Sequence, residues 1–416
     1  MVGTFIGLTA LARLPIGLAL LAAAVAGALL GGEGFALRYL VEGTFLYLDA
    51  MLIIVTAMAF MAAMRSSGAL VEIARQLVRT FGRRPVVLLP SLMVLAMLPG
   101  MLAGSSTAAV LTTGALVAPV LMSLGLSKLR AGALIAMAGV YGMVAPPVNV
   151  PVMLIGAGID IPYVGFELPL VAASFPLAVA TAYWMGWPLF RRRKDDLSEV
   201  LAALDEASPP TDDRIRPLQG FWAWTPLVWV VLAMTASRLP VPWLPDLGLP
   251  LIFALGAVMT LLASRVPNWA AELRGAVRDA LPVLGILVGV GAFIQVLTLT
   301  GGRGWVVVSL LSLPAAGLYL AAATGVPLFG AISAYGAASV LGVPLVLALL
   351  DAGDVIVITA AMSLLAGLGD LMPPTALAGI FAAQVVGEKK YTRMLAVCLG
   401  PALLTVAYAM MLLLVS

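Results

Sequence analysis

Apolar runs without any charged residue alternate with short polar segments along the whole chain. Several runs reach the ~18 residues that a helix needs to span a bilayer; examples are Leu14–Gly32, Ala131–Ile159, Leu168–Phe190 and Met394–Ser416. Strands of a membrane barrel would instead read as ~10-residue alternations of apolar and polar positions. Because only helices and closed barrels satisfy their backbone groups within lipid, the pattern predicts an all-α polytopic membrane protein.

Composition supports this class and excludes several functions. Of 416 residues, 62% are hydrophobic and 10% are charged, whereas soluble domains carry about 25% charged residues. The chain has no histidine and one cysteine, Cys398, which excludes a disulfide framework, His metal ligation and His proton relays. We expect no cofactor and no nucleic-acid partner. A membrane-embedded enzyme is the non-transport alternative, and it lacks the usual groups of catalytic residues.

The distribution of basic residues predicts the orientation. Lys and Arg are enriched in short cytoplasmic loops, and 19 of the 23 basic residues lie in five segments: Arg65–Arg84, Lys128–Arg130, Arg191–Arg216, Arg265–Arg278 and Lys389–Arg393. The segments between them hold Arg38, Arg238 and Arg303, and Arg13 lies within the first apolar helix. Placing the five basic segments inside gives one consistent threading, with the N-terminus inside and the C-terminus outside.

This threading divides the chain into two halves, residues 1–190 and residues 221–416. Residues 191–220 carry the densest charge and the pair Pro209 and Pro210, and we interpret them as a solvated cytoplasmic linker. Besides the broken segments described below, spans are expected at about 5–31, 44–64, 166–190, 221–238, 248–264, 280–299 and 393–415.

Two segments near the N-terminus have distinct patterns. Thr4–Leu30 is too long for the apolar region of a cleaved signal peptide, so we expect a retained helix that kinks near Leu14, Pro15 and Gly17. Within Arg65–Arg84, apolar residues recur at helical spacing with charged residues on the other face. This pattern predicts an amphipathic helix in the membrane interface, either as an anchor or as an arm that braces a moving domain.

Each half contains a predicted hairpin followed by a broken helix. The hairpins lie at about 85–126 and 313–350, and the broken helices at about 131–157 and 354–385. Both broken helices contain a glycine, three further residues and two prolines, namely Gly142, Pro146 and Pro147 in the first and Gly369, Pro373 and Pro374 in the second. Because the threading inserts the hairpins from opposite sides, the halves are predicted to be inverted repeats, which are typical of secondary transporters.

A proline pair at bilayer depth has a specific consequence. Each proline lacks an N–H and disfavours helix before it, so the helix breaks and exposes carbonyl and amide groups. Only protein or a water-filled cavity can satisfy such groups there, and the carbonyl ends suit a cation while the amide ends suit an anion. Neutral or acidic oxygens, which hard cations prefer, lie near the interruptions and breaks: Ser105, Ser106, Thr107, Thr112, Thr113, Asn149, Asp370 and Thr375.

Among these, Asp370 is the only acidic residue near the middle of a predicted span, which makes it a functional candidate. The alternative is an acid at a helix end that reaches the interface. The hydroxyl residues have an alternative role as well, because Ser and Thr in membrane helices often bond only to backbone or to neighbouring helices.

These motifs resemble those of the large membrane subunit of TRAP transporters, the tripartite ATP-independent periplasmic carriers. The similarity covers nearly the whole chain. Its most specific parts are the hairpin tip Gly104–Thr107, the break Ala145–Pro151 and the second break Gly367–Thr375, and the opening Leu14–Gly17 also matches. The resemblance implies an elevator transporter of the bacterial cytoplasmic (inner) membrane. It would take up an organic acid anion, often a C4-dicarboxylate or sialic acid, with sodium, a small membrane subunit and an extracytoplasmic binding protein.

The resemblance also implies site residues. One sodium site would be lined by Gly104, Ser105, Ser106, Thr107 and Asn149, and the other by Gly330, Ser333, Asp370 and Thr375. The substrate would lie between the hairpin tips, with Ser105, Ser106, Asn149 and Ser333 as candidate contacts.

Two departures from the family pattern keep alternatives open. Val148 stands where the family often has serine, and Ala108–Val110 lacks an Asp that many members have. A stand-alone sodium- or proton-coupled anion carrier of the same superfamily is the main alternative, and a passive channel is a further one.

Overall fold

The computed structural model describes residues 1–12, 14–191, 197–208, 214–238 and 247–416, and the regular structure in these ranges is helical throughout. In the described ranges six helices are long and apolar enough to cross a membrane: Leu48–Ser66, Pro85–Ala103, Ser106–Ser123, Glu167–Phe190, Trp269–Leu299 and Tyr391–Val415. This confirms an all-helical, multi-pass architecture with several apolar helices.

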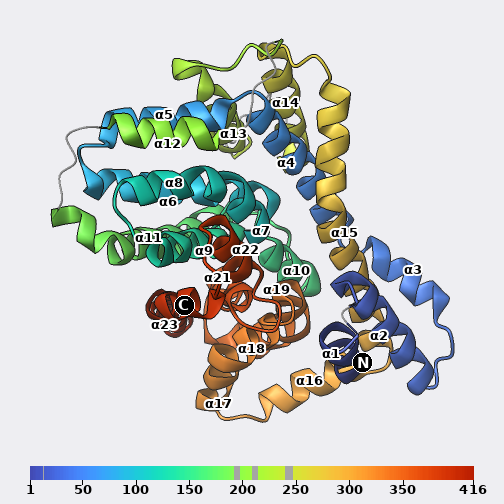
Figure 1. Ribbon diagram of the computed structural model, residues 1–416. Coiled ribbons are helices and arrows are strands. Elements are labelled where there is room, and N and C mark those ends of the chain that lie inside the picture. Colours follow the sequence, from blue (N-terminus) through green and yellow to red (C-terminus); the bar gives the residue numbers. More distant parts are fainter. Residues whose placement is uncertain (13, 192–196, 209–213, 239–246) are drawn as a thin grey trace.

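One group of helices, which we call the scaffold, forms the right-hand side of Figure 1. Its centre is α15, whose 31 residues extend about 46 Å at 1.5 Å per residue. Helices α2, α3 and α4 pack directly on α15, and α14 packs on α4. The members are α1 (Val2–Ala10), α2 (Ile16–Leu30), α3 (Leu37–Phe45), α4 (Leu48–Ser66), α13 (Thr225–Ala236), α14 (Gly248–Ala263) and α15 (Trp269–Leu299).

Glycine allows the scaffold helices to approach closely. A Cβ atom on Gly291 of α15 would lie 2.0 Å from the carbonyl oxygen of Gly43 on α3, and one on Gly289 would lie 2.4 Å from that of Gly17 on α2. Backbone contact of this kind is common between membrane helices, because small residues remove the side chains that would separate them.

The remaining large group of helices, which we call the transport body, contains two units with the same order of elements. The first unit comprises α6 (Pro85–Ala103), α7 (Ser106–Ala109), η1 (Val110–Gly114), α8 (Ala115–Ser123), α9 (Lys128–Val144), α10 (Val150–Gly158) and α11 (Glu167–Gly186). The second comprises α17 (Ala315–Leu320), η4 (Ala321–Gly325), α18 (Val326–Gly330), α19 (Ala334–Ala337), η5 (Ala338–Gly342), α20 (Val343–Ala348), α21 (Val355–Gly367), η7 (Leu368–Leu371), α22 (Leu377–Val385) and α23 (Tyr391–Val415).

The two units share local details. Each begins with a helical hairpin whose second arm starts at a serine N-cap, Ser105 or Ser333, and passes into a π-helical segment. In each, the following helix breaks at a cis Pro–Pro bond, between Pro146 and Pro147 or between Pro373 and Pro374. Antiparallel arms in the first hairpin are tied by Thr113, whose hydroxyl donates to the Ala96 carbonyl at 3.1 Å.

The scaffold and transport body meet over a few elements. Helix α4 touches α6, and α15 touches α19 and η5. Helix α16 (Gly302–Leu311) follows α15 and packs against α20, which joins the scaffold to the second hairpin (Figure 1).

Some element boundaries differ from the sequence expectation. The first apolar segment, expected as one kinked helix at about 5–31, is two helices, because α1 ends at Ala10 and α2 begins after Pro15. Arg13 lies outside the described residues. Helix α3 was not anticipated, and α15 begins at Trp269, about three turns before the expected start at 280. Its charged first turns explain the difference, since hydropathy alone cannot detect a helix that projects beyond the apolar layer.

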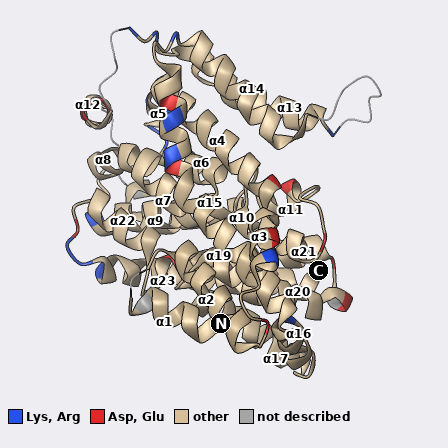
Figure 2. Cartoon of the chain, turned by 90° about the vertical axis from the view of Figure 1, so that its right-hand side faces the viewer, with Lys and Arg blue, Asp and Glu red and all other residues tan. Residues whose placement is uncertain are grey.

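The amphipathic helix expected within Arg65–Arg84 is α5 (Ala69–Phe81), which buries Leu70, Ile73, Ala74 and Val78. Figure 2 shows charged residues on α5 and in peripheral loops, while the central helices are nearly free of charge. Helix α5 packs on α6 and also on α12 (Ser198–Ala207), a helix within the 191–220 segment.

The interpretation of 191–220 as a solvated linker is therefore wrong at α12. Val200 and Leu204 are completely buried against the hairpin helix α8 and α5. Arg75 on α5 lies 2.7 Å from Asp205 and 2.8 Å from Glu72. Residues 192–196 and 209–213 of this segment, including Pro209 and Pro210, lie outside the described residues.

Candidate functional site

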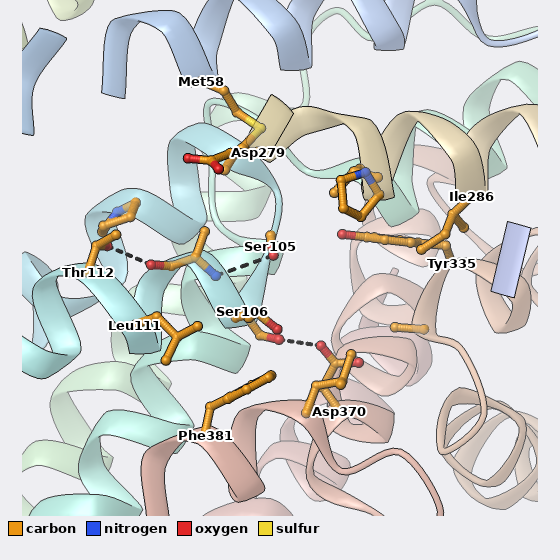
Figure 3. A pocket seen from close by; sticks show the side chains of 18 of the residues that line it. Met58, Ser105, Ser106, Leu111, Thr112, Asp279, Ile286, Tyr335, Asp370 and Phe381 are labelled. Carbon is orange, nitrogen blue, oxygen red and sulfur yellow. Dashed lines mark hydrogen bonds between the residues drawn. The ribbon is translucent and has the colours of Figure 1, made fainter. Parts of the chain in front are cut away.

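A cavity of about 600 Å³ lies between the scaffold and the transport body. Its scaffold wall comes from α4 and α15, and its opposite wall comes from the two hairpin tips and the second break. Figure 3 shows the side chains of Met58, Asp279 and Ile286 on one side, facing Ser105, Ser106, Tyr335 and Asp370 on the other. The second break and the two hairpin tips thus converge on one space.

Asp370 is the acidic residue at the centre of this site. It lies in η7, immediately before the second break, with 7% of its surface exposed. It is the only buried Asp, Glu, Lys or Arg among the described residues. Its Oδ2 accepts a hydrogen bond from the hydroxyl of Ser106, at the tip of the first hairpin (Figure 3). No described Lys or Arg forms an ion pair with it.

The tips of the two hairpins are joined directly. Tyr335, two residues after the Ser333 N-cap, donates its hydroxyl to the Gly104 carbonyl at 2.6 Å. Gly104 ends α6 with φ 61°, and a Cβ there would lie 2.4 Å from the Val150 side chain after the first break. Glycine is required here by both the left-handed backbone and the close approach. Its carbonyl is consequently turned toward the second hairpin.

Each tip serine caps its own helical arm. The Ser105 hydroxyl accepts from the Ala108 amide at 3.4 Å, and the Ser333 hydroxyl accepts from the Gly336 amide at 3.0 Å. N-cap serines satisfy one of the free amides at the start of a helix. The remaining first-turn amides have no intrahelical acceptor. Both helix starts line the cavity, so these dipoles are directed at it.

Asn149 is part of the first break but does not line the cavity. Its side chain is completely buried: the amide nitrogen donates to the Val144 carbonyl at 2.7 Å and to the Ser363 hydroxyl at 3.0 Å, and the oxygen accepts from the Val152 amide at 3.0 Å. Both donor positions are therefore used within the protein. In this arrangement Asn149 bridges the two half-helices α9 and α10 and ties them to α21.

Thr375 directly follows the second break. Its hydroxyl donates to the Ala331 carbonyl at 2.7 Å, which fastens the break to the tip of the second hairpin. Unlike Asn149 it lines the cavity, as do Thr107 and Thr112. Thr113 is buried away from the cavity, in its bond between the two arms of the first hairpin.

The glycines at the breaks allow helix contact. A Cβ on Gly369 would lie 2.0 Å from the Gly330 carbonyl carbon, and one on Gly142 would lie 2.5 Å from the Met97 carbonyl oxygen. Gly330 faces Gly369 and does not line the cavity. The structure therefore gathers Ser105, Ser106, Thr107, Ser333, Asp370 and Thr375 around one cavity and leaves Gly104, Asn149 and Gly330 behind its walls.

Several residues at the site were not found by sequence reasoning. Tyr335 and Ser363 carried no signal, because a Tyr or Ser in an apolar helix is common and their partners lie far along the chain. Arg65, Arg278 and Asp279 also line the cavity, with Arg65 Nη2 4.0 Å from Asp279 Oδ2. Sequence reasoning places no arginine near the substrate, since Arg65 begins and Arg278 ends a predicted cytoplasmic segment. The charged start of α15 could have indicated Arg278 and Asp279.

Comparison with known proteins supports this architecture. Among solved structures, the YdaH transporter of Alcanivorax borkumensis superposes with a TM-score of 0.59, at 17% sequence identity, over 91% of this chain and 88% of that chain. At this identity the similarity concerns the fold. A comparison with curated protein sequences finds no match.

Fold, apolar helices and family together define a multi-pass membrane transport protein. The family described as the tripartite ATP-independent periplasmic transporter, DctM component, matches residues 2–416. The chain belongs to this family, as its motifs indicated. The DctM component is the large component of a tripartite transporter, which implies a small subunit and a binding protein as partners.

Proposed function

We propose that the protein is the large permease subunit of a TRAP system that takes up an organic acid anion, of C4-dicarboxylate size, together with sodium across the bacterial cytoplasmic membrane. Asp370 carries this proposal. It is an acid buried at a helix break, bonded to a hairpin tip and open to the cavity. An acid in such a position within a membrane protein is expected to serve an ion or proton pathway.

The charge of Asp370 is the reason for proposing that a cation is bound and transported. A buried carboxylate is costly unless a positive charge or a proton compensates it. No described basic side chain pairs with Asp370, so a bound ion would supply that charge. The oxygens of Ser106, Ser333 and Thr375 lie around the same cavity and suit a hard cation. Sodium meets this requirement, and a proton on Asp370 is the alternative that the ion dependence of uptake tests.

The other groups at the cavity are the reason for proposing that the substrate is an anion. The helical arms Ser106–Ser123 and Ala334–Ala348 both begin there, and helix starts favour negative charge. Arg65 and Arg278 add two positive side chains and Asp279 one negative side chain on the scaffold wall. A volume of about 600 Å³ lies within the range of small-molecule sites and holds a small carboxylate with water.

We further propose an elevator movement, in which the transport body carries the cavity past the scaffold. The main scaffold contacts run through few elements, α6, α19, η5 and α20, which supports a body that moves as a unit. In this scheme the hairpins α6–α8 and α17–α20 are re-entrant from opposite sides, with the N-terminus inside and the C-terminus outside, as the basic residues predict.

Uptake into proteoliposomes tests the proposal. Purified protein, reconstituted with its small subunit, is offered labelled C4-dicarboxylates with and without an inward sodium gradient, and with and without the co-encoded binding protein. We expect accumulation only when sodium and the binding protein are both present. Sodium-driven uptake without the binding protein would instead establish a stand-alone carrier, and uptake driven only by a proton gradient would remove sodium from the mechanism.

A further inference from the structure

Two arginines contact the transport body, one from the scaffold and one from α16, the helix that follows the scaffold helix α15. Arg238, just after α13, forms an ion pair with Glu167, the first residue of α11. Arg303, in the first turn of α16, donates to the carbonyl of Gly158, the last residue of α10. The latter contact places a positive charge at the carbonyl end of a helix, where the helix dipole favours it.

The two acceptors flank one short loop, residues 159–166. Tyr163 in this loop donates its hydroxyl to the Pro147 carbonyl at 3.1 Å and accepts from the Asn149 amide at 3.2 Å. Its ring stacks on Phe166, with centroids 5.6 Å apart. The loop is thus fastened to the first break on one side and receives the two arginines on the other.

The position of these contacts relative to the cavity follows from α4 and α15. Ile53, near the start of α4, lines a small space of about 160 Å³ with Tyr163, Glu167 and Arg238. Arg65, near the end of α4, lines the main cavity, so the two lie about 18 Å apart along the helix. Asp279 and Arg303 are separated by most of α15. The arginine contacts therefore close one side of the molecule while the cavity lies toward the other.

We propose that Arg238 and Arg303 form a latch that holds the transport body in the position seen here, with the cavity open toward the end of α4. Movement of the body along α4 and α15 separates Arg238 from Glu167, and it separates Arg303 from Gly158 when α16 stays with α15. Tyr163 is then a positioning residue that transmits the state of the first break to this latch. This inference rests on the elevator movement in the proposed function, and it adds the residues that set the balance between its end states.

Thiol labelling measures that balance without any transport. Cys398 is the sole cysteine, so Leu111→Cys in a Cys398→Ala background provides one reactive thiol on the cavity wall. A membrane-impermeant maleimide is applied to inside-out and right-side-out membrane vesicles. The ratio of the two labelling rates then reports the side to which the cavity opens.

We expect the Arg238→Gln/Arg303→Gln variant to lower the inside-out to right-side-out ratio about threefold, the size of effect that one or two exposed ionic contacts produce. The matched control is Arg38→Gln, which removes the third arginine predicted on this side. Among the described residues Arg38 pairs within α3, with Glu42 at 2.8 Å, so the ratio should not change. The exchange Glu167→Arg/Arg238→Glu should restore the ratio lost in Arg238→Gln.

A ratio in the double variant equal to that of Arg38→Gln overturns the latch, as does failure of the exchange to restore it. Should the double variant not accumulate in the membrane, Glu167→Gln alone is measured, with the same expected direction. Labelling needs no substrate or ion gradient. If uptake does not depend on sodium, the proposed sodium coupling is refuted, but the expected effect of the arginine variants on the labelling ratio is unchanged. If the Leu111→Cys thiol in protein with both arginines intact reacts faster in right-side-out than in inside-out vesicles, the proposed orientation of the protein in the membrane is refuted.

Discussion

The hydroxyl of Ser106 donates to Oδ2 of Asp370, across a separation of 264 residues in the chain. This bond joins the tip of the first hairpin to the break of the second unit. The Tyr335 bond to the Gly104 carbonyl joins the two tips in the same region. Both halves of the protein therefore contribute residues to the wall of the cavity, and neither half alone contains the site.

Replacing the carboxylate of Asp370 tests its proposed role in cation binding. Asp370→Asn keeps the size and the bond from Ser106 but removes the charge, so we expect sodium-dependent uptake to fall about tenfold or more, as for the loss of ~1.4 kcal/mol of binding. Asp279→Asn, on the scaffold wall of the same cavity, is the matched control. Initial uptake rates over a range of sodium concentrations measure both. Equal sodium dependence in the two variants would remove Asp370 from the cation site.

Asn149 is expected to act through stability, because its polar atoms are used within the protein. Asn149→Ala leaves the Val144 carbonyl and the Val152 amide without these partners in a buried site, at a cost of about 1–3 kcal/mol for each group. We expect a lower melting temperature of the purified protein and a parallel fall in uptake.

Asn268→Ala is the control for Asn149, since Asn268 also caps a helix, α15, but at an exposed position. Its expected cost is about 1 kcal/mol. A melting temperature of Asn149→Ala at or above that of Asn268→Ala, with uptake lost, would instead make Asn149 a ligand, as the family resemblance implied.

Gly369→Ala tests the contact between the second break and its hairpin. The new Cβ would lie 2.0 Å from the Gly330 carbonyl carbon, so α18 and η7 must separate. We expect poor accumulation in the membrane and a cost of about 1–3 kcal/mol, typical of overpacking. Gly275→Ala on α15 is the control, because a Cβ at that position would have open space within 4 Å and alanine favours helix there. Equal thermal stability of the two variants would contradict the close packing.

The contact between α5 and the linker should depend on pH through Glu72. Burial acts to raise the pKa of Glu72, but hydrogen bonds from Gln76, Arg75 and the Gly220 amide outweigh it and lower the pKa below its ordinary value. A carboxyl group whose pKa is lower in the folded state stabilises that state above its unfolded pKa. This contribution is lost as the pH falls through the lowered, folded-state pKa.

We therefore expect Glu72→Gln to lower the melting temperature at pH 7, and the difference from the unmodified protein to shrink as the pH falls below about 4, near the ordinary pKa of glutamate. Glu206→Gln, on the exposed part of α12, is the control and should not change this pH dependence. A melting-temperature difference for Glu72→Gln that persists unchanged into acid would refute the role of its charge.

Local features of the fold could be predicted because they depend on residue type alone. An apolar run without charge favours the membrane wherever it occurs, and a proline pair breaks a helix whatever its neighbours. The breaks at Pro146–Pro147 and Pro373–Pro374, the tips at Ser105 and Ser333, and the amphipathic α5 were found in this way. Likewise, the family followed from the motifs around those breaks.

The membership of the site was decided only by the tertiary structure. Asn149 and Asp370 both carry oxygens beside a proline pair. The side chain of Asn149 forms its hydrogen bonds within the protein and does not line the cavity, whereas Asp370 faces the cavity. Tyr335, Ser363 and Arg65 join the site or its support through partners that lie far away in sequence or on the other body. Such contacts depend on how helices from distant parts of the chain pack together, and hydrophobic patterning specifies which helix faces are buried but not which residues meet there.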